Sequence, residues 1–511
     1  MAETAPGFVR IPNRGIITAC TMAATLMQAL DSTIANVALP YMQGSFAASY
    51  DEITWVLTSY VTAAAIMTAP VGWMASRFGR KNLYVVCVVG FTIASMLCGA
   101  AQSLNEIVLA RVMQGAFGAA LVPLSQSVLF AAYPRERQGF AMALFGVGVM
   151  IGPVLGPVLG GWLTQNYSWR WVFYINLPIG ILDLIGIMIF LPETPRGAAG
   201  KLDWFGFVTL SLALGAFQIM LDRGEQKDWF SSGEIIIEAI VAVAAIYLFV
   251  VHVFTADKPF VRPSMFRDRN FAAGMFFIVI IGLTYYASMA LQPPYLQGMM
   301  NYPVVAAGMI MGPRGIGTMA SMLVVGRLVG RTDIRILLAI GLTLTAWSFY
   351  AMTGWTPDVS QRAIIGVTMV QGFGLGFLFV PLSAATLATL PLQERTEGAG
   401  LYSLFRNIGS SVGISVVNAL LVRNTQVNHA DIVTRVTAVN RALENPNVAR
   451  FWSPFTAAGR AALDAVVTQQ AQIIAYIDDY KLLMIATLAV LPLLVVFRKP
   501  ASGVAPVAVA D

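Results

Sequence analysis

Apolar stretches long enough to cross a lipid bilayer recur along almost the whole chain, and no other feature limits its fold so strongly. The stretch NLYVVCVVGFTIASMLCGAA, which begins at Asn82, is typical. A helix of about 20 mostly apolar residues spans the hydrocarbon core of a membrane. Only 11% of the 511 residues are charged, and 57% are hydrophobic. A soluble protein carries roughly 25% charged residues, so the sequence predicts an all-α membrane protein.

The apolar stretches divide into fourteen candidate spans, separated mostly by short polar loops. They cover approximately residues 15–40, 53–74, 83–101, 105–130, 140–163, 169–191, 202–221, 234–255, 271–292, 304–329, 335–355, 362–389, 398–422 and 480–497. One connection, residues 423–479, is much longer than the others.

Basic residues indicate which loops face the cytoplasm, because cytoplasmic loops of membrane proteins carry an excess of Lys and Arg. With the N-terminus placed inside, the inner loops hold Arg77, Arg80, Lys81, Arg135, Arg137, Arg196, Lys201, Lys258, Arg262, Arg267, Arg269, Arg327, Arg331, Arg335 and Arg395. The short outer loops hold only Arg170, Arg223, Lys227 and Arg362. This asymmetry predicts that both termini are cytoplasmic and that the 423–479 loop lies outside.

A weak internal repeat relates the first and last parts of the chain. QGAFGAALVPLS begins at Gln114, and QGFGLGFLFVPLS begins 257 residues later at Gln371. GWMASRFGRK begins at Gly72, and GRLVGR begins 254 residues later at Gly326. The similar offsets predict two six-helix halves with two extra helices between them.

Parallel repeats of this kind are similar to those of the major facilitator fold. The N-terminal six-helix half then covers residues 15–191, the inserted helix pair residues 202–255, and the C-terminal six-helix half residues 271–497.

Three motifs extend this resemblance. They are LDSTIANVALP at Leu30–Pro40, WRWVFYINLPIG from Trp169 and QIMLDRGEQKDWFSS from Gln218. With them, residues 15–497 resemble the EmrB-type, fourteen-span drug:proton antiporters of the major facilitator superfamily. The resemblance implies proton-driven export of hydrophobic drugs or toxic compounds across the bacterial inner membrane. An exporter or importer of a specific metabolite is the alternative on the same fold.

The resemblance also implies partners. An EmrB-type pump works with a periplasmic membrane-fusion adaptor and an outer-membrane channel, besides protons, small-molecule substrates and membrane lipids. Within the long loop, apolar residues between Thr456 and Tyr480 recur near helical spacing and predict an amphipathic extension of the last span. This segment either docks the adaptor or packs as a cap over the transporter.

Two further motifs match this family. A cytoplasmic loop motif follows the second span and consists of Gly72, Arg77, Gly79, Arg80 and Lys81, with Ser76 in place of the usual acidic residue. The antiporter motif of exporters lies in the fifth span and consists of Gly148, Gly152, Pro153, Gly156 and Gly160. Small residues every four positions let two membrane helices approach closely.

Charged side chains inside membrane spans are costly and are functional candidates by default. Asp31 lies nine residues before Pro40, and Arg111 lies six residues after Asn105. At 1.5 Å per residue the two depths below the outer surface are about 13 Å and about 9 Å. We therefore expect Asp31 to carry the proton with Arg111 as its partner, although a static buried ion pair would give the same pattern.

A substrate cavity is expected between the halves. Its candidate residues are Gln28, Asn36, Gln114, Asp183, Arg314 and Arg406.

An enzyme is not expected. The sequence contains no Gly-x-Ser-x-Gly elbow, no His-Glu-x-x-His and no Walker motif. Cys20, Cys87 and Cys98 fall in apolar runs without metal-ligand spacing, and the two histidines are far apart. No cofactor, metal or nucleic acid is therefore predicted, and the net charge of +6 is spread over many short loops.

Overall fold

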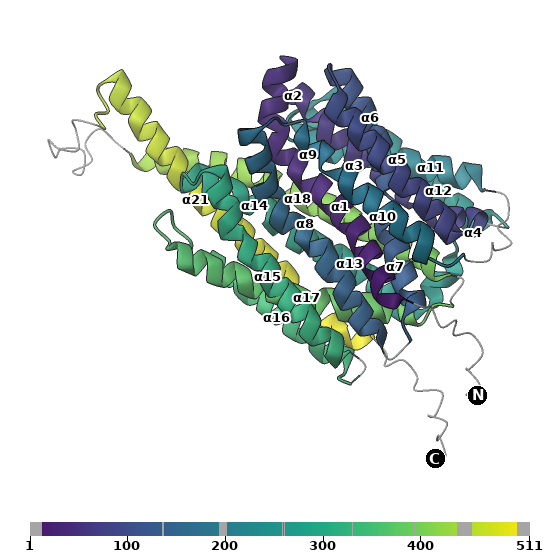
Figure 1. The fold of residues 1–511 in the computed structure, drawn as a ribbon. Coiled ribbons are helices and arrows are strands. Elements are labelled where there is room, and N and C mark those ends of the chain that lie inside the picture. Colours follow the sequence, from purple (N-terminus) through teal and green to yellow (C-terminus); the bar gives the residue numbers. More distant parts are fainter. Residues whose placement is uncertain are drawn as a thin grey trace, which may run out of the picture.

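The computed structural model describes residues 13–134, 137–193, 202–257, 259, 261–329, 331–391, 394–436 and 452–497. These residues form a bundle of helices, and no β-sheet occurs among them. Figure 1 shows the long helices running in roughly one direction, as expected for membrane spans.

The N-terminal half and the inserted pair contain twelve of the helices. They are α1 (Arg14–Phe46), α2 (Tyr50–Ile53), α3 (Trp55–Thr68), α4 (Val71–Phe78), α5 (Arg80–Ala100), α6 (Leu104–Gly118), α7 (Leu121–Ala132), α8 (Gln138–Asn166), α9 (Trp171–Tyr174), α10 (Asn176–Phe190), α11 (Trp204–Arg223) and α12 (Gly233–Thr255). A short 3-10 turn, η2 (Trp229–Ser231), precedes α12.

The C-terminal half contains longer helices and two π-helical segments. In chain order they are η3 (Pro263–Arg267), α13 (Arg269–Ile281), η4 (Gly282–Tyr286), α14 (Ala287–Pro294), η5 (Tyr295–Met299), α15 (Val304–Leu328), α16 (Ile334–Met352), α17 (Gln361–Ala388), α18 (Arg395–Arg435), α21 (Ala457–Ala489) and η6 (Leu491–Val496). The π-helices η4 and η5 flank α14, and such bulges often occur near functional sites.

Several helices begin at side-chain caps that are readable in the sequence. Asp203 accepts from the Gly206 backbone N–H at the start of α11, and Asp268 accepts from Phe271 at the start of α13. Such caps satisfy backbone donors that a helix leaves free at its first turn. Ser103, Ser360 and Thr456 cap α6, α17 and α21 in the same way.

Helices occupy all fourteen expected span ranges, but the number of spans stays a prediction. Among the described residues, ten helices are long and apolar enough to cross a membrane, or eleven if the bent pair α3–α4 counts as one span. That pair bends by 58° just before α4, where Pro70 precedes the first residue. The first span, α1, carries many polar residues along its length, and α8 and α15 occupy the remaining expected ranges.

Contacts between the halves gather at the end of the bundle where α1 begins and η6 ends (Figure 1). The start of α8 packs on the end of α15, where a Cβ on Gly139 would meet Val329 Cβ at 2.8 Å. The rings of Phe145 and Phe379 stack with centroids 6.2 Å apart. Ser127 and Thr396 share a 2.7 Å hydrogen bond between α7 and α18. The halves are therefore joined at this end.

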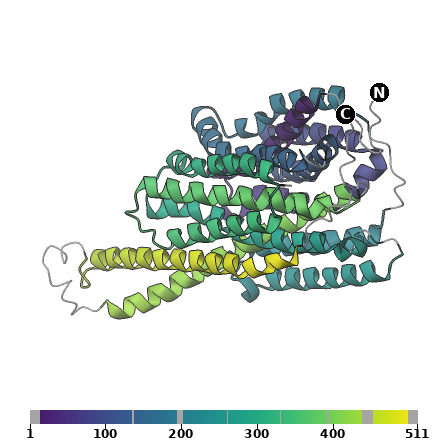
Figure 2. The same cartoon turned by 90° about the horizontal axis from the view of Figure 1, so that it is seen from below.

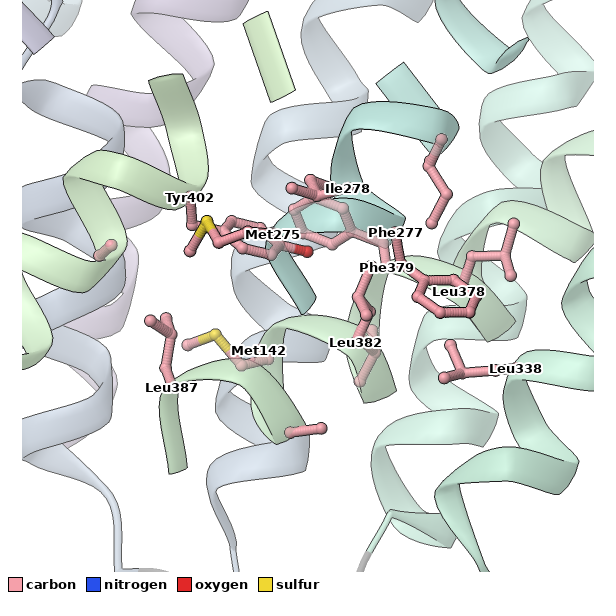
Figure 3. Close-up of a cluster of buried hydrophobic side chains, with 14 of the residues drawn as sticks. Met142, Met275, Phe277, Ile278, Leu338, Leu378, Phe379, Leu382, Leu387 and Tyr402 are labelled. Carbon is pink, nitrogen blue, oxygen red and sulfur yellow. The ribbon is translucent and has the colours of Figure 1, made fainter. Parts of the chain in front are cut away.

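The largest buried apolar cluster crosses the same junction. Figure 3 shows Met142 of α8 together with Met275 of α13, Phe379 of α17 and Tyr402 of α18. Side chains from both halves thus share one core.

The connection at 423–479 is largely helical in its described part, and the amphipathic extension expected between Thr456 and Tyr480 is present as the first part of α21. Helix α18 continues to Arg435, beyond the expected span end at residue 422, and α21 begins at Ala457. No glycine or proline interrupts residues 423–435, so nothing in the local sequence stops the helix. Figures 1 and 2 show the two helix ends extending together beyond the rest of the bundle. We call residues 423–436 and 452–479 the projecting hairpin.

Candidate functional site

Two opposite charges meet in the interior of the N-terminal half. Asp31 lies on α1 and Arg111 on α6, and their side chains are 0% and 1% exposed. Arg111 Nη1 lies 2.6 Å from Asp31 Oδ2, which makes a buried ion pair. The structure thus brings together the two residues that the sequence placed at similar depth.

Two amide side chains complete the surroundings of the carboxylate. Gln114 Nε2 donates to Asp31 Oδ1 at 2.7 Å, and Asn176 Nδ2 donates to the same oxygen at 3.3 Å. The Asn176 amide also donates to Ser95 Oγ at 2.9 Å. Gln114 Oε1 accepts from Arg111 Nη1 at 2.8 Å. Both carboxylate oxygens therefore accept hydrogen bonds from fixed donors.

Helix α3 holds Arg111 from the other side. Arg111 Nε donates to the Val56 carbonyl at 3.0 Å, and its guanidinium carbon lies 4.1 Å from the ring centre of Tyr60. Gln28 Nε2 donates to the Tyr60 hydroxyl at 3.4 Å. A guanidinium over an aromatic face gains most when water is excluded, as it is at this buried site.

The charge network joins five helices of the N-terminal half. Helices α1, α3, α5, α6 and α10 each contribute a residue to it. An ionised carboxylate only accepts hydrogen bonds, whereas a protonated one must donate its own hydrogen. A proton on Asp31 neutralises the carboxylate, so it weakens the ion pair with Arg111 and the charge-assisted hydrogen bonds from Gln114 and Asn176. Loading a proton would therefore loosen contacts between helices.

The sequence alone does not single out Asn176, Ser95 or Tyr60 as part of this site. Asn176 stands in the motif WRWVFYINLPIG, where it is a polar residue in an otherwise apolar stretch. A polar residue at that position was the one feature of the sequence that could have indicated its role. Ser95 and Tyr60 lie in ordinary apolar helices and give no comparable signal.

Two cavity candidates near Asp31, Gln114 and Asn36, lie in different surroundings. Gln114 is fully buried in the charge network, so it is a partner of Asp31 and Arg111 and not part of an open surface. Asn36 is exposed and donates to the Ser32 carbonyl of its own helix at 3.3 Å. Gln28, Ser32 and Asn36 follow each other at four-residue spacing, so they form one polar stripe along α1.

Asp183 lies apart from this network, inside the N-terminal half. Its side chain is 2% exposed, and neither carboxylate oxygen has a hydrogen-bond partner among the described residues. One turn later, Gly186 packs against Cys20 of α1. Gly186 and Cys20 line a very small pocket together with Ile17, Thr21, Tyr84, Ile187 and Leu191. Asp183 therefore belongs to the packing between α1, α5 and α10 rather than to the junction of the halves.

A second polar cluster lies at the related place in the C-terminal half. Gln371 Nε2 donates to Ser288 Oγ at 2.9 Å, and Gln292 Nε2 lies 3.4 Å from Gln371 Oε1. Arg314 Nη2 donates to Gln292 Oε1. Arg314 and these three partners are all buried.

The two clusters are related by the internal repeat. Ser288 follows Asp31 by 257 residues, and Gln371 follows Gln114 by the same offset. In both halves the glutamine donates a hydrogen bond to its counterpart, Gln114 to Asp31 and Gln371 to Ser288. A Cβ on Gly115 would strike the Tyr60 carbonyl, and one on Gly372 would strike the Arg314 carbonyl. Arg314 of α15 therefore contacts α17 at the position where Tyr60 of α3 contacts α6.

Arg406 lies half-buried on α18 and is not part of the Gln292–Gln371 hydrogen bonds. Its backbone carbonyl approaches Gly282, where a Cβ would lie 2.6 Å away. The close contact between α18 and η4 is therefore a packing feature at this residue.

The cytoplasmic loop motif forms the turn between α4 and α5. Gly79 has a φ of 85°, a conformation that glycine adopts without strain. Lys81 Nζ donates to the Met188 carbonyl in the last turn of α10 at 2.9 Å, where a cation is favoured. Gly72 instead lies inside α4, and a Cβ there would meet the Glu397 Cα at 2.7 Å. Arg77 is exposed and Arg80 is half-buried.

The four glycines of the antiporter motif all face α1. A Cβ on Gly148 would meet Thr25 Oγ1 at 3.1 Å, one on Gly152 would meet Ala29 Cβ at 2.5 Å, and one on Gly160 would meet Ile34 Cγ1 at 2.8 Å. Gly156 packs against Thr33 in the same way. The side chains of Pro153 and Pro157 lie outside the described part of the chain. The motif therefore holds α8 against the helix that carries Asp31.

Comparison with known proteins agrees with this architecture. The family model of the Major Facilitator Superfamily matches residues 21–414. The multidrug export protein EmrB of Haemophilus influenzae is 36% identical over 428 residues, which are 83% of this chain and 84% of that protein. The EmrB protein of Escherichia coli K12 is 35% identical over 447 residues, 87% of this chain and 86% of that protein.

A solved structure supports the fold independently. The proton:xylose symporter XylE bound to a glucose derivative matches with a TM-score of 0.59 at 13% identity, covering 92% of this chain and 96% of that one. At this identity the likeness concerns the fold alone.

Proposed function

Because the chain belongs to the major facilitator superfamily, and within it to the EmrB-type transporters, we propose that it is a drug:proton antiporter in which Asp31 carries the proton. Its relatives identify it as a multi-pass inner-membrane multidrug efflux transporter, a secondary transporter and not an enzyme. Proton coupling, the adaptor partners and the cytoplasmic position of both termini are parts of the proposal.

The hydrogen bonding of both Asp31 oxygens to residues of neighbouring helices is the observation that carries the proposal. Its two oxygens accept from Arg111, Gln114 and Asn176. A proton on Asp31 would remove the negative charge that these donors face, and the donors lie on two other helices, α6 and α10. Protonation is therefore linked to helix packing, which is what coupling of a proton to a conformational change requires.

Substrate need not touch the carboxylate for this coupling. Asp31 and Arg111 are buried, so direct competition between drug and proton for Asp31 would first require the helices to separate. The polar stripe of Gln28, Ser32 and Asn36 offers a second route, because Gln28 bonds the Tyr60 hydroxyl that lies over Arg111. A drug that moved Gln28 would disturb the support of Arg111.

Proton-dependent dye efflux in everted membrane vesicles tests the proposal directly. Respiration acidifies the vesicle interior, and we expect a cationic dye such as ethidium to accumulate inside only when the protein is present. A proton ionophore should abolish the accumulation. Dye movement that is insensitive to the ionophore would contradict proton coupling, and transport of one metabolite without any drug would favour the metabolite transporter.

We further propose that the projecting hairpin docks the periplasmic adaptor of a tripartite pump. Its two helices are tied by a 3.0 Å contact between His429 and Asp464. Large apolar side chains remain exposed on it, with Phe455 78% exposed. The others are Val427, Val433, Trp452, Val466 and Ile474. Exposed apolar groups at the end of a bundle are typical of a protein-binding surface.

Shortening the hairpin should separate docking from transport. We expect deletion of residues 430–463, with a four-residue Gly/Ser linker from His429 to Asp464, to abolish adaptor pull-down. Dye accumulation in vesicles should remain, because the deletion leaves the Asp31 network untouched. A chain with the same linker inserted after Trp452, with no residues removed, is the control. Undiminished adaptor binding by the deletion variant would support a self-packed cap instead.

A further inference from the structure

The two polar clusters differ in their balance of charge. The N-terminal cluster contains one carboxylate and one guanidinium, Asp31 and Arg111. In the C-terminal half, Ser288 stands at the position of Asp31 and Thr368 at the position of Arg111, 257 residues later in each case. Arg314 adds a positive charge where the first half has Tyr60. The second cluster therefore holds a cation without an internal counter-charge.

The guanidinium of Arg314 is buried and incompletely bonded. The residue is 4% exposed, and no carboxylate among the described residues lies within 4.0 Å of it. Nη2 donates to Gln292 and the guanidinium also interacts with the Tyr285 hydroxyl, whereas Nε and Nη1 have no hydrogen-bond partner in the described part of the chain. A buried charge of this kind is costly unless something pairs with it.

The surroundings of Arg314 are aromatic. Its guanidinium carbon lies 5.8 Å from the ring centre of Tyr285, and Tyr480 is close enough to interact with it electrostatically. Tyr480 packs against Trp355, which in turn contacts Tyr295, with ring centroids 5.9 Å and 5.8 Å apart. The hydroxyls of Tyr480 and Tyr295 have no hydrogen-bond partner among the described residues. Unused donors and an apolar wall thus occur side by side.

We propose that Arg314 is an anion subsite of the export pathway that takes the carboxylate of an amphiphilic substrate. The planar guanidinium offers N–H groups that match the two oxygens of a carboxylate. The apolar tail would lie against the Tyr295–Trp355–Tyr480 aromatic group. This inference rests on the proposed function and names one class of compound that the transporter would carry.

Asp479 is the internal competitor for this role. It is buried beside Tyr480, and both of its carboxylate oxygens lack a partner among the described residues. No ion pair joins Asp479 to Arg314 among the described residues. If Asp479 reached Arg314 in another conformation, the cation would be neutralised without a ligand. An experiment must therefore separate these two possibilities.

Binding of decanoate and of its methyl ester to the full-length protein tests the subsite. The protein is placed in nanodiscs of zwitterionic lipid, so no anionic headgroup competes, and affinities are measured by calorimetry. We expect decanoate to bind the wild type more tightly than the ester. Arg314→Gln should weaken decanoate binding about tenfold or more, the loss expected for hydrogen bonds to a charged group, and leave the ester unaffected. Arg314→Lys should fall between, because it keeps the charge without the planar fork.

Two further variants make the outcome decisive. Arg327→Gln removes an exposed charge from the same helix, α15, and should bind decanoate like the wild type. Asp479→Asn should not weaken decanoate binding. The proposal is overturned if Arg314→Gln binds decanoate normally, or if Arg314→Gln and Asp479→Asn weaken acid and ester alike. If the wild-type protein shows no ionophore-sensitive dye efflux, the proposed function is contradicted, while the result of the binding experiment still stands.

Discussion

Replacing Asp31 with asparagine is expected to abolish proton-driven drug efflux while most of the protein still folds. The asparagine side chain has nearly the same shape as aspartate but does not bind or release a proton near neutral pH. Proton binding can therefore no longer drive movement of the helices. Dye accumulation in everted vesicles should fall to that of vesicles lacking the protein. Drug binding to the purified variant should also lose its dependence on pH.

The stability of the Asp31→Asn variant depends on what remains around Arg111. Removing one partner of a buried ion pair usually costs about 3–5 kcal/mol, because the other charge is left unpaired. Here Arg111 keeps the Val56 carbonyl, the Gln114 carbonyl and the ring of Tyr60. We therefore expect a loss below that range, seen as a lower melting temperature rather than as absence of folded protein.

The double variant Asp31→Asn/Arg111→Gln distinguishes a proton carrier from a static ion pair. It restores charge balance, so it should recover stability under either interpretation. A static pair predicts that transport recovers together with the folded protein. A proton carrier predicts that transport stays lost in the stable double variant. If Asp31→Asn still concentrates drug in a pH-dependent way, Asp31 is not the carrier and Asp183 becomes the next residue to test.

The fold was predictable from the sequence because membrane spans are encoded locally. Length and apolar composition identify each helix without knowledge of its neighbours. The same local rule placed Asp31 and Arg111 at a common depth, since the rise along a helix is fixed. Of the hairpin, the first part of α21 was predicted from its helical spacing, whereas the extension of α18 was not, because a helix that leaves the membrane loses the apolar signal while its backbone continues unchanged.

The network around the ion pair was harder to predict because it depends on how each helix is rotated. Asn176 and Asp31 are far apart in sequence, and their contact requires α10 to turn one particular face toward α1. Gln114 shows the same limit: the sequence named it as a cavity candidate, and only the rotation of α6 shows that it donates to Asp31. Unpaired groups such as those of Arg314 become visible only when all neighbours are known.

Substitution of Gly152 with alanine is expected to give the largest packing defect among the glycines of the antiporter motif. An added Cβ would lie 2.5 Å from Ala29 Cβ, 2.6 Å from Ala29 C and 2.7 Å from Leu30 N. Two of these atoms are backbone, so α1 and α8 must separate. Overpacking of this kind costs about 1–3 kcal/mol and occasionally more. Thermal unfolding in detergent should show the loss as a lowered melting temperature.

Other glycines of the chain supply a graded control. Gly148→Ala should be milder, because its closest contacts are 3.1 and 3.2 Å. Gly366→Ala on α17 meets nothing within 4 Å and should be neutral or stabilising by about 0.5–1 kcal/mol, the usual gain from removing a helical glycine. Equal melting temperatures for the three variants would contradict the close α1–α8 contact.

The same substitution links packing to the charge network, because Gly152 presses on α1 beside Asp31. Moving α1 away from α8 at Ala29 and Leu30 shifts Asp31 relative to the donors on α6 and α10. We therefore expect Gly152→Ala to lower the rate of dye accumulation per folded molecule, beyond its effect on stability. Adding Ala29→Gly removes one of the three close contacts and should restore part of both properties. Full activity of the folded Gly152→Ala fraction would show that the network tolerates movement of α1, and then packing in this motif would serve stability alone.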